Sequence, residues 1–216
     1  MDYAQARRNM IDCQLRTNKV TDDALLEAMG TLPREEFVPA ALRAKSYSDC
    51  DIGISATRSM MAPMTLARMF QCLKISRGDV ALVVGSSSGY AAAVMGQIAR
   101  VVFALESNAE NQEQIGSLYT SLGLDNVVSV TGPLEKGWAK EAPYDVIYVD
   151  GAVESLPDEL FEQLGDGGRL VAVVVENGIG RATRFIRKNA RNSGNVIFDA
   201  NAQLFAEFSQ PQDFVF

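Results

Sequence analysis

A short segment rich in glycine and serine has the residue types that bind a ligand through the backbone. Gly85 ends an apolar run that we predict to be a strand, and Gly89 and Tyr90 open a predicted helix. Ser86 and Ser87 lie between them. Backbone amide groups at a helix N-terminus attract polar or anionic ligands, and in parallel sheets they face the crevice at the strand ends. This segment is the first candidate for a cofactor site.

An acidic residue follows at the spacing expected for an adenosine ligand. Glu106 ends the next predicted strand, about twenty residues after the glycines, where an acid hydrogen-bonds ribose hydroxyls. Ser107 follows it and joins the candidate site. We expect Glu106 to be an exposed strand-end carboxylate, so that its replacement by alanine weakens ligand binding with little loss of stability. The arrangement favours an adenosine-type cofactor.

The glycine pattern of this segment is incomplete. The dinucleotide fingerprint G-x-G-x-x-G is absent, because Ser87 holds its middle position and the final glycine has the wrong spacing. A side chain at this position narrows the approach to a ligand. Two interpretations therefore stay open from these residues alone: a cofactor site, or a tight strand-to-helix turn that serves only the fold.

The sequence contains no histidine, which limits the possible chemistry. Histidine-activated serine or cysteine nucleophiles, histidine general acids and bases, and imidazole metal sites are excluded. We predict no metal site. Any reaction must use carboxylates, hydroxyls, backbone amides or a cofactor.

The elements around the candidate site alternate between short apolar runs and helical segments. Unbroken runs of valine, isoleucine and leucine are typical of a parallel sheet that helices cover on both faces. We predict strands over residues 79–85, 100–106, 126–130, 144–150 and 168–175, and helices over 89–99, 108–123 and 157–165.

Two helices are predicted before this alternation begins. The segment 21–33 has an amphipathic pattern with Thr21 as its N-cap. Pro63 begins the second helix, because proline suits the first helical turn. We predict one domain, 1–216, in which an N-terminal helical cap, 1–62, precedes an α/β core, 63–216.

The C-terminal region has a different pattern. An Asn-Ser-Gly-Asn sequence, residues 192–195, separates two extended segments, which indicates a turn of an antiparallel hairpin at the sheet edge. The arginines of residues 181–191 alternate with apolar residues, so we expect them on the solvated side of an edge strand. Binding of an acidic partner is the alternative.

The composition bounds the class of protein. The 216 residues carry a net charge of −7, which argues against binding to nucleic acid through its phosphates. The N-terminus has no apolar leader region, and the longest branched apolar run, residues 170–175, is too short for a membrane span. Three cysteines without metal-type spacing fit reduced thiols, so we predict a cytoplasmic protein with no membrane partner. No pattern indicates an oligomeric state.

Two further groups of residues have alternative roles. Asp150 ends a predicted strand at the same crevice rim, where it could bind a substrate amine or a cation; capping of the following turn is the role that we favour slightly. The methionines Met60, Met61, Met64 and Met69 surround the second predicted helix. Core filling is favoured for them over an adaptable substrate wall.

Several blocks of the sequence, in the same order, resemble the protein-L-isoaspartate O-methyltransferase family over nearly the whole chain. Residues 33–39 resemble its run P-R-x-x-F-V-P, and residues 46–54 resemble its segment A-Y-x-D-x-x-x-x-I. Residues 80–99 resemble its S-adenosylmethionine loop V-L-E-I-G-T-G-S-G-Y-x-A-A-V-L-A, and residues 142–171 its late strand-helix-strand section. The chain is identified as a divergent member of this family.

The resemblance implies a fold, a cofactor and a substrate. The fold is the class I methyltransferase fold, a Rossmann-like, doubly wound α/β sheet that is mostly parallel, with an antiparallel C-terminal edge and an N-terminal helical cap. The cofactor is S-adenosyl-L-methionine, and the methyl acceptors are isoaspartyl residues of damaged peptides or proteins. The cofactor-binding residues would be Gly85, Ser86, Ser87, Gly89, Tyr90, Glu106 and Ser107. An acceptor carboxylate is ionised at neutral pH, so the lack of histidine is compatible with this reaction.

Departures from the family pattern fall near the expected transfer site. Aligned on Pro63 without gaps, this chain has Ser59 where the family has threonine, and Met61 where the family has its active-site serine. A shifted alignment would restore Ser59 to the serine's role. Both residues are therefore candidates for the catalytic position.

Other departures lie on the cofactor side. Val83 replaces the family's acid before the glycine loop, Ser87 replaces its middle glycine, and Pro133 replaces an aspartate. Three functions stay open. We favour methyl transfer to isoaspartyl carboxyl groups; the alternatives are methyl transfer to another acceptor, with Asp150 as a substrate-binding residue, and a catalytically silent relative that serves as a binding module.

Overall fold

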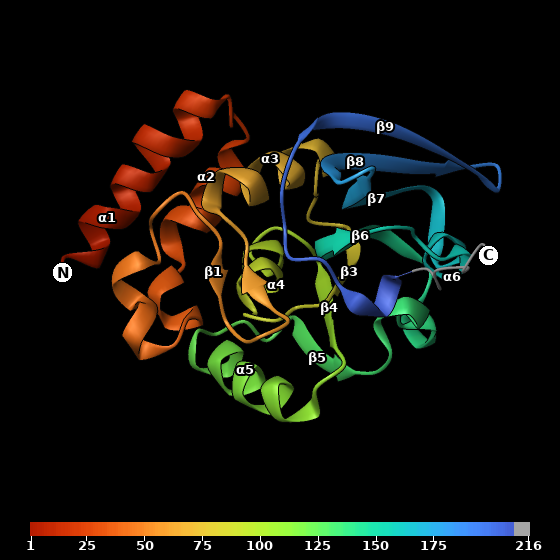
Figure 1. Cartoon of the computed structure of the whole chain (residues 1–216). Helices are drawn as coiled ribbons and strands as arrows, with labels where there is room; N and C mark the ends of the chain where they lie inside the picture. Colours follow the sequence, from red (N-terminus) through yellow and green to blue (C-terminus); the bar gives the residue numbers. More distant parts are fainter. Residues whose placement is uncertain (210–216) are drawn as a thin grey trace, which may run out of the picture.

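A seven-stranded sheet forms the centre of the protein (Figure 1). The computed structural model describes residues 1–209, apart from the side chains of residues 110 and 111; the last residues of the predicted domain, 210–216, lie outside the described part. The strands are β3 (Val80–Val84), β4 (Val101–Glu106), β5 (Val127–Thr131), β6 (Tyr144–Val153), β7 (Leu164–Glu176), β8 (Ile179–Lys188) and β9 (Arg191–Asp199). Their order is β5-β4-β3-β6-β7-β8-β9, with β3 to β7 parallel and the pairs β7–β8 and β8–β9 antiparallel.

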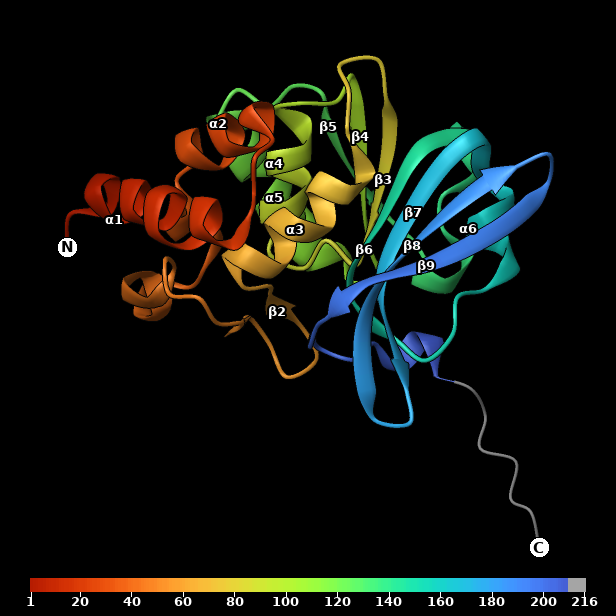
Figure 2. The ribbon, with the colours of Figure 1, turned by 90° about the horizontal axis from the view of Figure 1, so that it is seen from above.

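Helices cover both faces of this sheet (Figure 2). The helices are α1 (Tyr3–Asn9), α2 (Asp23–Thr31), α3 (Pro63–Leu73), α4 (Tyr90–Gly96), α5 (Ala109–Ser121) and α6 (Asp158–Glu162). α1 to α5 lie on one side of the sheet and α6 on the other. Ala81 and Val83 belong to the core of the first side, and Leu82 and Val84 to that of the second. The predicted α/β fold, mostly parallel with an antiparallel C-terminal edge, is confirmed.

Shorter elements complete the N-terminal part and the loops. A π-helix over Met10–Leu15 continues α1, and a two-stranded hairpin pairs β1 (Ile52–Gly53) with β2 (Ser59–Met60). The 3₁₀ segments are Arg16–Asn18, Arg34–Phe37, Ala40–Lys45, Leu134–Lys136, Ala139–Glu141 and Ala206–Phe208. Within residues 1–209, no helix combines the length and the apolar character needed to cross a membrane.

The N-terminal helices are tied to the core by buried polar contacts. Arg34 is fully buried, and it donates hydrogen bonds to the carbonyl oxygens of Ser46 and Met61, both at 2.6 Å. Its guanidinium also lies over the ring of Tyr90, at 4.6 Å from the ring centre. Arg34 therefore joins the cap, the segment before α3 and the start of α4.

Helix α2 starts one residue later than predicted. Asp22 is its N-cap instead of Thr21, and the Asp22 carboxylate accepts a hydrogen bond from the Leu25 amide at 3.1 Å. The Thr21 amide donates to Gln71 Oε1 of α3 at 2.6 Å. An ionised carboxylate is a stronger acceptor than a hydroxyl, and it also interacts favourably with the helix dipole. Pro63 occupies the first turn of α3, as predicted.

The C-terminal hairpins differ from the prediction in two ways. The residues 192–195 lie within β9, and the β8–β9 turn is formed by Asn189 and Ala190, which both have positive φ. β8 is an inner strand, so its arginines are not on a solvated edge. Arg184 donates to the Cys72 carbonyl at 3.1 Å, and Arg187 donates to the carbonyl of Phe161.

After β9 the chain returns across the end of the central strands (Figure 1). We call residues 203–209 the C-terminal strap. Ala152 of β6 holds it, because the Ala152 amide donates to the Gln203 carbonyl at 2.8 Å and the Ala152 carbonyl accepts from the Phe205 amide at 2.9 Å. Phe208 is buried in the core of the second side. The sequence patterns predict no element here.

Arg169 of β7 supports the opposite end of the sheet, and its removal tests that role. It donates to the carbonyls of Leu73, Lys74 and Asp145, and it pairs with Asp79 at 2.6 Å. We expect Arg169→Met to lower the free energy of unfolding by about 2–4 kcal/mol, because these acceptors lose their partner. Chemical denaturation measures the change. The exposed Arg191→Met is the control; an equally small loss in both variants would contradict this role.

Candidate functional site

The candidate site lies where β3 and β4 end and α4 begins. The order of the strands reverses at β3: β4 and β5 lie on one side of it, and β6 and β7 on the other. In open α/β sheets, ligands bind in the crevice at such a switch point. A cavity of about 340 Å³ opens there. Its lining residues are Ile54, Ser55, Thr57, Arg58, Ser87, Glu106, Ser107, Asn108 and Glu207. The predicted residues Glu106, Ser107 and Ser87 are thus brought together.

Two glycines give the strand-to-helix turn its shape. Gly85 has φ +76° and Gly89 has φ +80°, a region that favours glycine. A Cβ on Gly89 would lie 2.6 Å from Ile115 Cγ2, so helix α5 can pack this closely only against a glycine. A Cβ on Gly85 would lie 2.3 Å from the ring of Phe205. The floor of the crevice therefore has no room for side chains at these positions.

Glu106 is buried, which corrects the expectation of an exposed carboxylate. Only 1% of its surface is accessible. Its Oε1 accepts hydrogen bonds from the Ser107 amide at 2.7 Å and from Ser107 Oγ at 3.1 Å. We therefore expect Glu106→Ala to destabilise the fold as well, because it removes the main partner of the buried Arg58 guanidinium.

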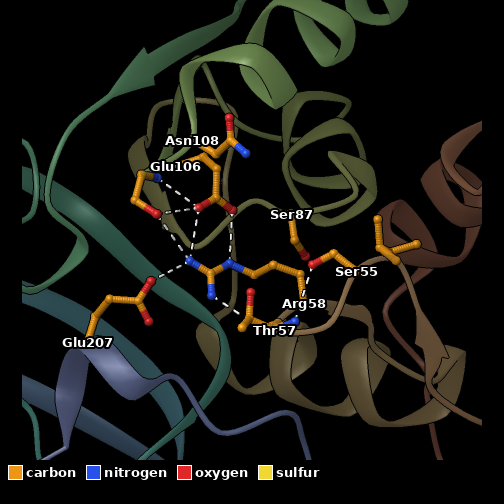
Figure 3. A pocket seen from close by; sticks show the side chains of 9 residues that line it. Ser55, Thr57, Arg58, Ser87, Glu106, Asn108 and Glu207 are labelled. Atoms are coloured by element: carbon orange, nitrogen blue, oxygen red, sulfur yellow. Dashed lines mark hydrogen bonds and ion pairs between the residues drawn. The ribbon is translucent and has the colours of Figure 1, made fainter.

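Arg58 is the main partner of Glu106 (Figure 3). Its Nη2 donates to Glu106 Oε1 at 3.0 Å and its Nε donates to Oε2 at 3.2 Å, which makes a two-pronged ion pair. Nη2 also donates to Glu207 of the strap at 2.6 Å. Burial lowers the pKa of Arg58, but the bonds to the two carboxylates outweigh burial and raise the pKa above its usual value.

The strap brings two more side chains to the site. The ring of Phe205 lies under the Arg58 guanidinium, at 4.6 Å from the ring centre, and Phe205 is 1% exposed. Burial raises the pKa of Glu207, but the hydrogen bond from Arg58 outweighs it and the pKa is lowered overall. Sequence reasoning missed Arg58, Phe205 and Glu207. No spacing rule connects them, because Glu106 and Glu207 lie 48 and 149 residues after Arg58.

The other predicted cofactor residues have different surroundings. Ser86 is fully buried, and Ser87 Oγ donates to the Ser59 carbonyl at 3.3 Å. Tyr90 is also fully buried and packs edge-on against Phe37, so its side chain points into the core and away from the cavity. Among the residues that the structure describes, no group of three or more acidic or cysteine side chains could hold a metal ion.

The candidates for the transfer site fall in two places. Ser59 lies half-buried in β2, with its carbonyl against Ser87. Met61 is 3% exposed, and its sulfur lies 3.4 Å from the Tyr148 hydroxyl. That hydroxyl lies 3.1 Å from Asp150 Oδ1. Met61 and Asp150 thus share a buried contact through Tyr148, whereas Ser59 belongs to the hairpin above the cavity.

Asp150 is a buried carboxylate that accepts a hydrogen bond from the Tyr148 hydroxyl, instead of capping the following turn as predicted. It is 4% exposed, and burial raises its pKa well above the usual value, although Tyr148 and Arg34 act against this. The methionines largely fill the core, as predicted: Met60, Met61 and Met69 are buried, and Met64 is half-buried.

Comparison with known proteins identifies the family. The model of the family protein-L-isoaspartate(D-aspartate) O-methyltransferase matches residues 5–204 of this chain. The chain belongs to this family. Members of the family methylate isoaspartyl residues with S-adenosylmethionine as the methyl donor.

Relatives and solved structures agree with this assignment. A protein-L-isoaspartate O-methyltransferase of Koribacter versatilis is 38% identical over 188 residues, covering 87% of this chain and 84% of the relative. One of Methylorubrum populi is 36% identical over 198 residues, covering 89% and 93%. A solved protein-L-isoaspartate O-methyltransferase has a TM-score of 0.81 at 25% identity, covering 93% of this chain and 65% of its own.

A Plasmodium falciparum structure is similar in fold. This putative protein-L-isoaspartate O-methyltransferase, solved in complex with S-adenosyl-L-homocysteine, has a TM-score of 0.78 at 18% identity and covers 96% of this chain and 99% of its own.

Two side chains of the chain itself contact the groups in the crevice that S-adenosylmethionine would use. The glycine turn and Glu106 are the groups that an adenosine ligand needs. However, Arg58 donates hydrogen bonds to both oxygens of Glu106, and the buried Phe205 ring, a member of the core of the second side, packs directly against Gly85. Arg58 would have to release Glu106 for ribose hydroxyls to take both carboxylate oxygens.

The buried carboxylate of Asp150 makes a pH-dependent prediction. A carboxyl group whose pKa is raised by folding stabilises the folded state fully at pH values below its pKa in the unfolded chain, about 4. This stabilisation is lost as pH rises through its pKa in the folded chain. We therefore expect Asp150→Asn to raise Tm at pH 7–8, and the gain to shrink toward pH 4. The asparagine oxygen can still accept from Tyr148.

Thermal unfolding followed by circular dichroism between pH 4.5 and 8 measures this difference. The exposed Asp125→Asn serves as the control and should follow the native chain. A variant that is less stable than the native chain at pH 8 would show that the ionised carboxylate of Asp150 is stabilising, contrary to this prediction.

Proposed function

We propose that this chain transfers a methyl group from S-adenosyl-L-methionine to isoaspartyl carboxyl groups of peptides or proteins. The observation that carries this proposal is the position of Glu106 beside the glycine turn, at the strand ends where the family's loop binds its cofactor. The match of the family model over residues 5–204 supports it. Relatives that share 34% to 39% of residues are named for this activity.

The main role of the protein in this reaction is to position the two substrates. The cofactor, when bound, supplies an electrophilic methyl group. The acceptor carboxylate is already ionised at neutral pH, so no catalytic base is needed. The chain must hold the carboxylate close to the methyl group and keep water away. A chain without histidine can do both.

We assign the cofactor to the crevice floor. Gly85, Ser86, Ser87 and Gly89 form the turn, and Glu106 with Ser107 forms the opposite wall; the buried Tyr90 contributes by fixing the start of α4 through its core contacts. The glycine conformations and the short strand-to-helix turn support this assignment.

We assign the acceptor to the side of the crevice that holds Met61, Asp150 and Ser59. The Tyr148 hydroxyl links Met61 and Asp150, and the Ser59 carbonyl contacts the glycine turn through Ser87. Met61 excludes water but cannot donate a strong hydrogen bond. The acceptor carboxylate therefore has one donor fewer than a serine would give it.

We further propose that the chain forms one domain, a helical cap over residues 1–62 and a core over 63–216, and acts on damaged proteins in the cytoplasm. The contacts of Arg34 and Gln71 between cap and core support the single domain. The free thiols Cys13, Cys50 and Cys72 suit a reducing compartment.

One observation favours a second candidate, a catalytically silent relative that acts as a binding module. Arg58 pairs with Glu106 and Phe205 packs against Gly85, so the chain's own side chains contact both groups proposed to bind the cofactor. In a silent relative, Arg58 and Phe205 would keep these contacts when S-adenosylmethionine is added. It is distinguished from the enzyme by the absence of methyl transfer at any cofactor concentration.

A peptide methylation assay tests the proposed function. At saturating S-adenosylmethionine, the native chain should form a methyl ester on an isoaspartyl peptide and none on the matched aspartyl peptide. Because the acceptor lacks a donor, the native rate should be low, and Met61→Ser should raise it by about tenfold or more. Met60→Ser, which removes a neighbouring buried methionine, is the control and should not raise the rate.

The result also separates the candidates. Rapid transfer by the native chain that Met61→Ser leaves unchanged would assign the acceptor donor to Ser59. Cofactor binding without any ester on the isoaspartyl peptide, in either form, would sink the isoaspartyl proposal and favour another acceptor.

A further inference from the structure

We propose that Arg58 and the C-terminal strap form a self-cap that competes with the cofactor for the crevice, so that the frequency of strap opening sets the affinity for S-adenosyl ligands. This inference rests on the proposed function, because it takes the crevice as the cofactor site. It names Arg58, Phe205 and Glu207 as determinants of cofactor affinity that no sequence motif contains.

The hydrogen bonds of Glu106 are the first argument. A carboxylate offers about four acceptor positions. Glu106 Oε1 accepts from Arg58, from the Ser107 amide and from Ser107 Oγ, and Oε2 accepts from Arg58 Nε. Ribose hydroxyls would need these same oxygens. A ribose that binds both oxygens of Glu106 therefore competes with the Arg58 guanidinium for them.

The position of Phe205 is the second argument. Its ring would lie 2.3 Å from a Cβ on Gly85 and 2.6 Å from a Cβ on Gly151. Two glycines thus form a slot in which one flat group fits against the backbone. The phenyl ring uses the close backbone approach that a glycine turn offers to a ligand. The ring also lies under the Arg58 guanidinium, so the strap supports the arginine that contacts Glu106.

The attachment of the strap is the third argument, because it explains how the crevice can open. The strap pairs with the sheet only at Ala152, through two backbone hydrogen bonds. Glu207, with 29% of its side chain exposed, adds the ion pair to Arg58. Segments with few backbone pairs near a chain end open locally at a lower free energy than the central strands.

The charge balance links the three side chains. Arg58 carries one positive charge between the two carboxylates Glu106 and Glu207. When the strap leaves, the Arg58–Glu106 pair loses the Phe205 ring below it and its second carboxylate. Arg58 then lies on an exposed hairpin loop, which frees it to turn away from Glu106. Strap opening and release of Glu106 are thus coupled.

Calorimetric titration with S-adenosylhomocysteine tests the self-cap. Phe205→Ala removes the ring from the slot, and we expect it to bind the ligand at least about tenfold more tightly than the native full-length chain, because the open state is more populated. Phe198→Ala is the matched control. It removes a phenylalanine that also stacks on an arginine, Arg68, but lies on β9 away from the crevice. Its affinity should equal that of the native chain.

Hydrogen exchange reports the strap directly. Without ligand, the Phe205 amide should exchange faster in Glu207→Gln than in the native chain, and S-adenosylhomocysteine should accelerate its exchange in the native chain. Glu207→Gln keeps every ring of the strap, so it tests the proposal even if Phe205→Ala unfolds. It should bind the ligand several-fold more tightly than the native chain.

The outcomes separate the two proposals. Equal affinity of the native chain and both strap variants, with the Phe205 amide protected in the complex, overturns the self-cap and leaves the cofactor site in place. Fast exchange of the strap in the variants, with no binding of S-adenosylhomocysteine to any of them, overturns the cofactor site itself and the self-cap with it.

Discussion

The buried ion pair between Arg58 and Glu106 is the interaction on which the arrangement of the site depends. Both groups are largely removed from water, and such pairs persist only when hydrogen bonds satisfy both partners. Here the pair is completed by Ser107 on one side and by Glu207 on the other. Removing Arg58 would leave the buried Glu106 without a counter-charge, at a cost of about 3–5 kcal/mol. The pair therefore fixes the hairpin loop, the end of β4 and the strap relative to one another.

The sheet provides a rigid frame for this pair. β3 and β6 are central strands with continuous apolar sequences, and their ends stop at Gly85 and near Gly151. Because both glycines lack a side chain, the Phe205 ring packs directly against the backbone at the sheet end. The frame determines where binding occurs, and the loops determine what is bound.

Much of the fold could be predicted from local patterns. The unbroken apolar runs gave the parallel strands because burial on both faces requires them, and Pro63 marked the start of α3 through its own backbone restriction. The turn near residues 192–195 was misplaced because Asn189 and Ala190 form it with positive φ, although alanine rarely adopts that conformation. Local sequence preferences could not reveal this tertiary requirement.

Only one part of the site, the glycine turn and Glu106, could be predicted from the sequence. The glycine turn and Glu106 lie within one βαβ unit, so their spacing carries information. Arg58 and Phe205 reach the site from a hairpin and from the chain end, and no periodicity connects such segments. The burial of Glu106 also depends on them. A carboxylate predicted to be exposed is buried because two distant segments cover it.

The departures from the family pattern are not independent of one another. The serine that replaces the middle glycine donates through its Oγ to the Ser59 carbonyl, one residue after Arg58. It therefore ties the glycine turn to the hairpin that carries the guanidinium. The Met61 carbonyl, two residues further, accepts from the buried Arg34. In this chain, contacts within the protein thus hold the 58–61 segment against the glycine turn and the cap, and they fix the backbone from which the Arg58 side chain reaches Glu106.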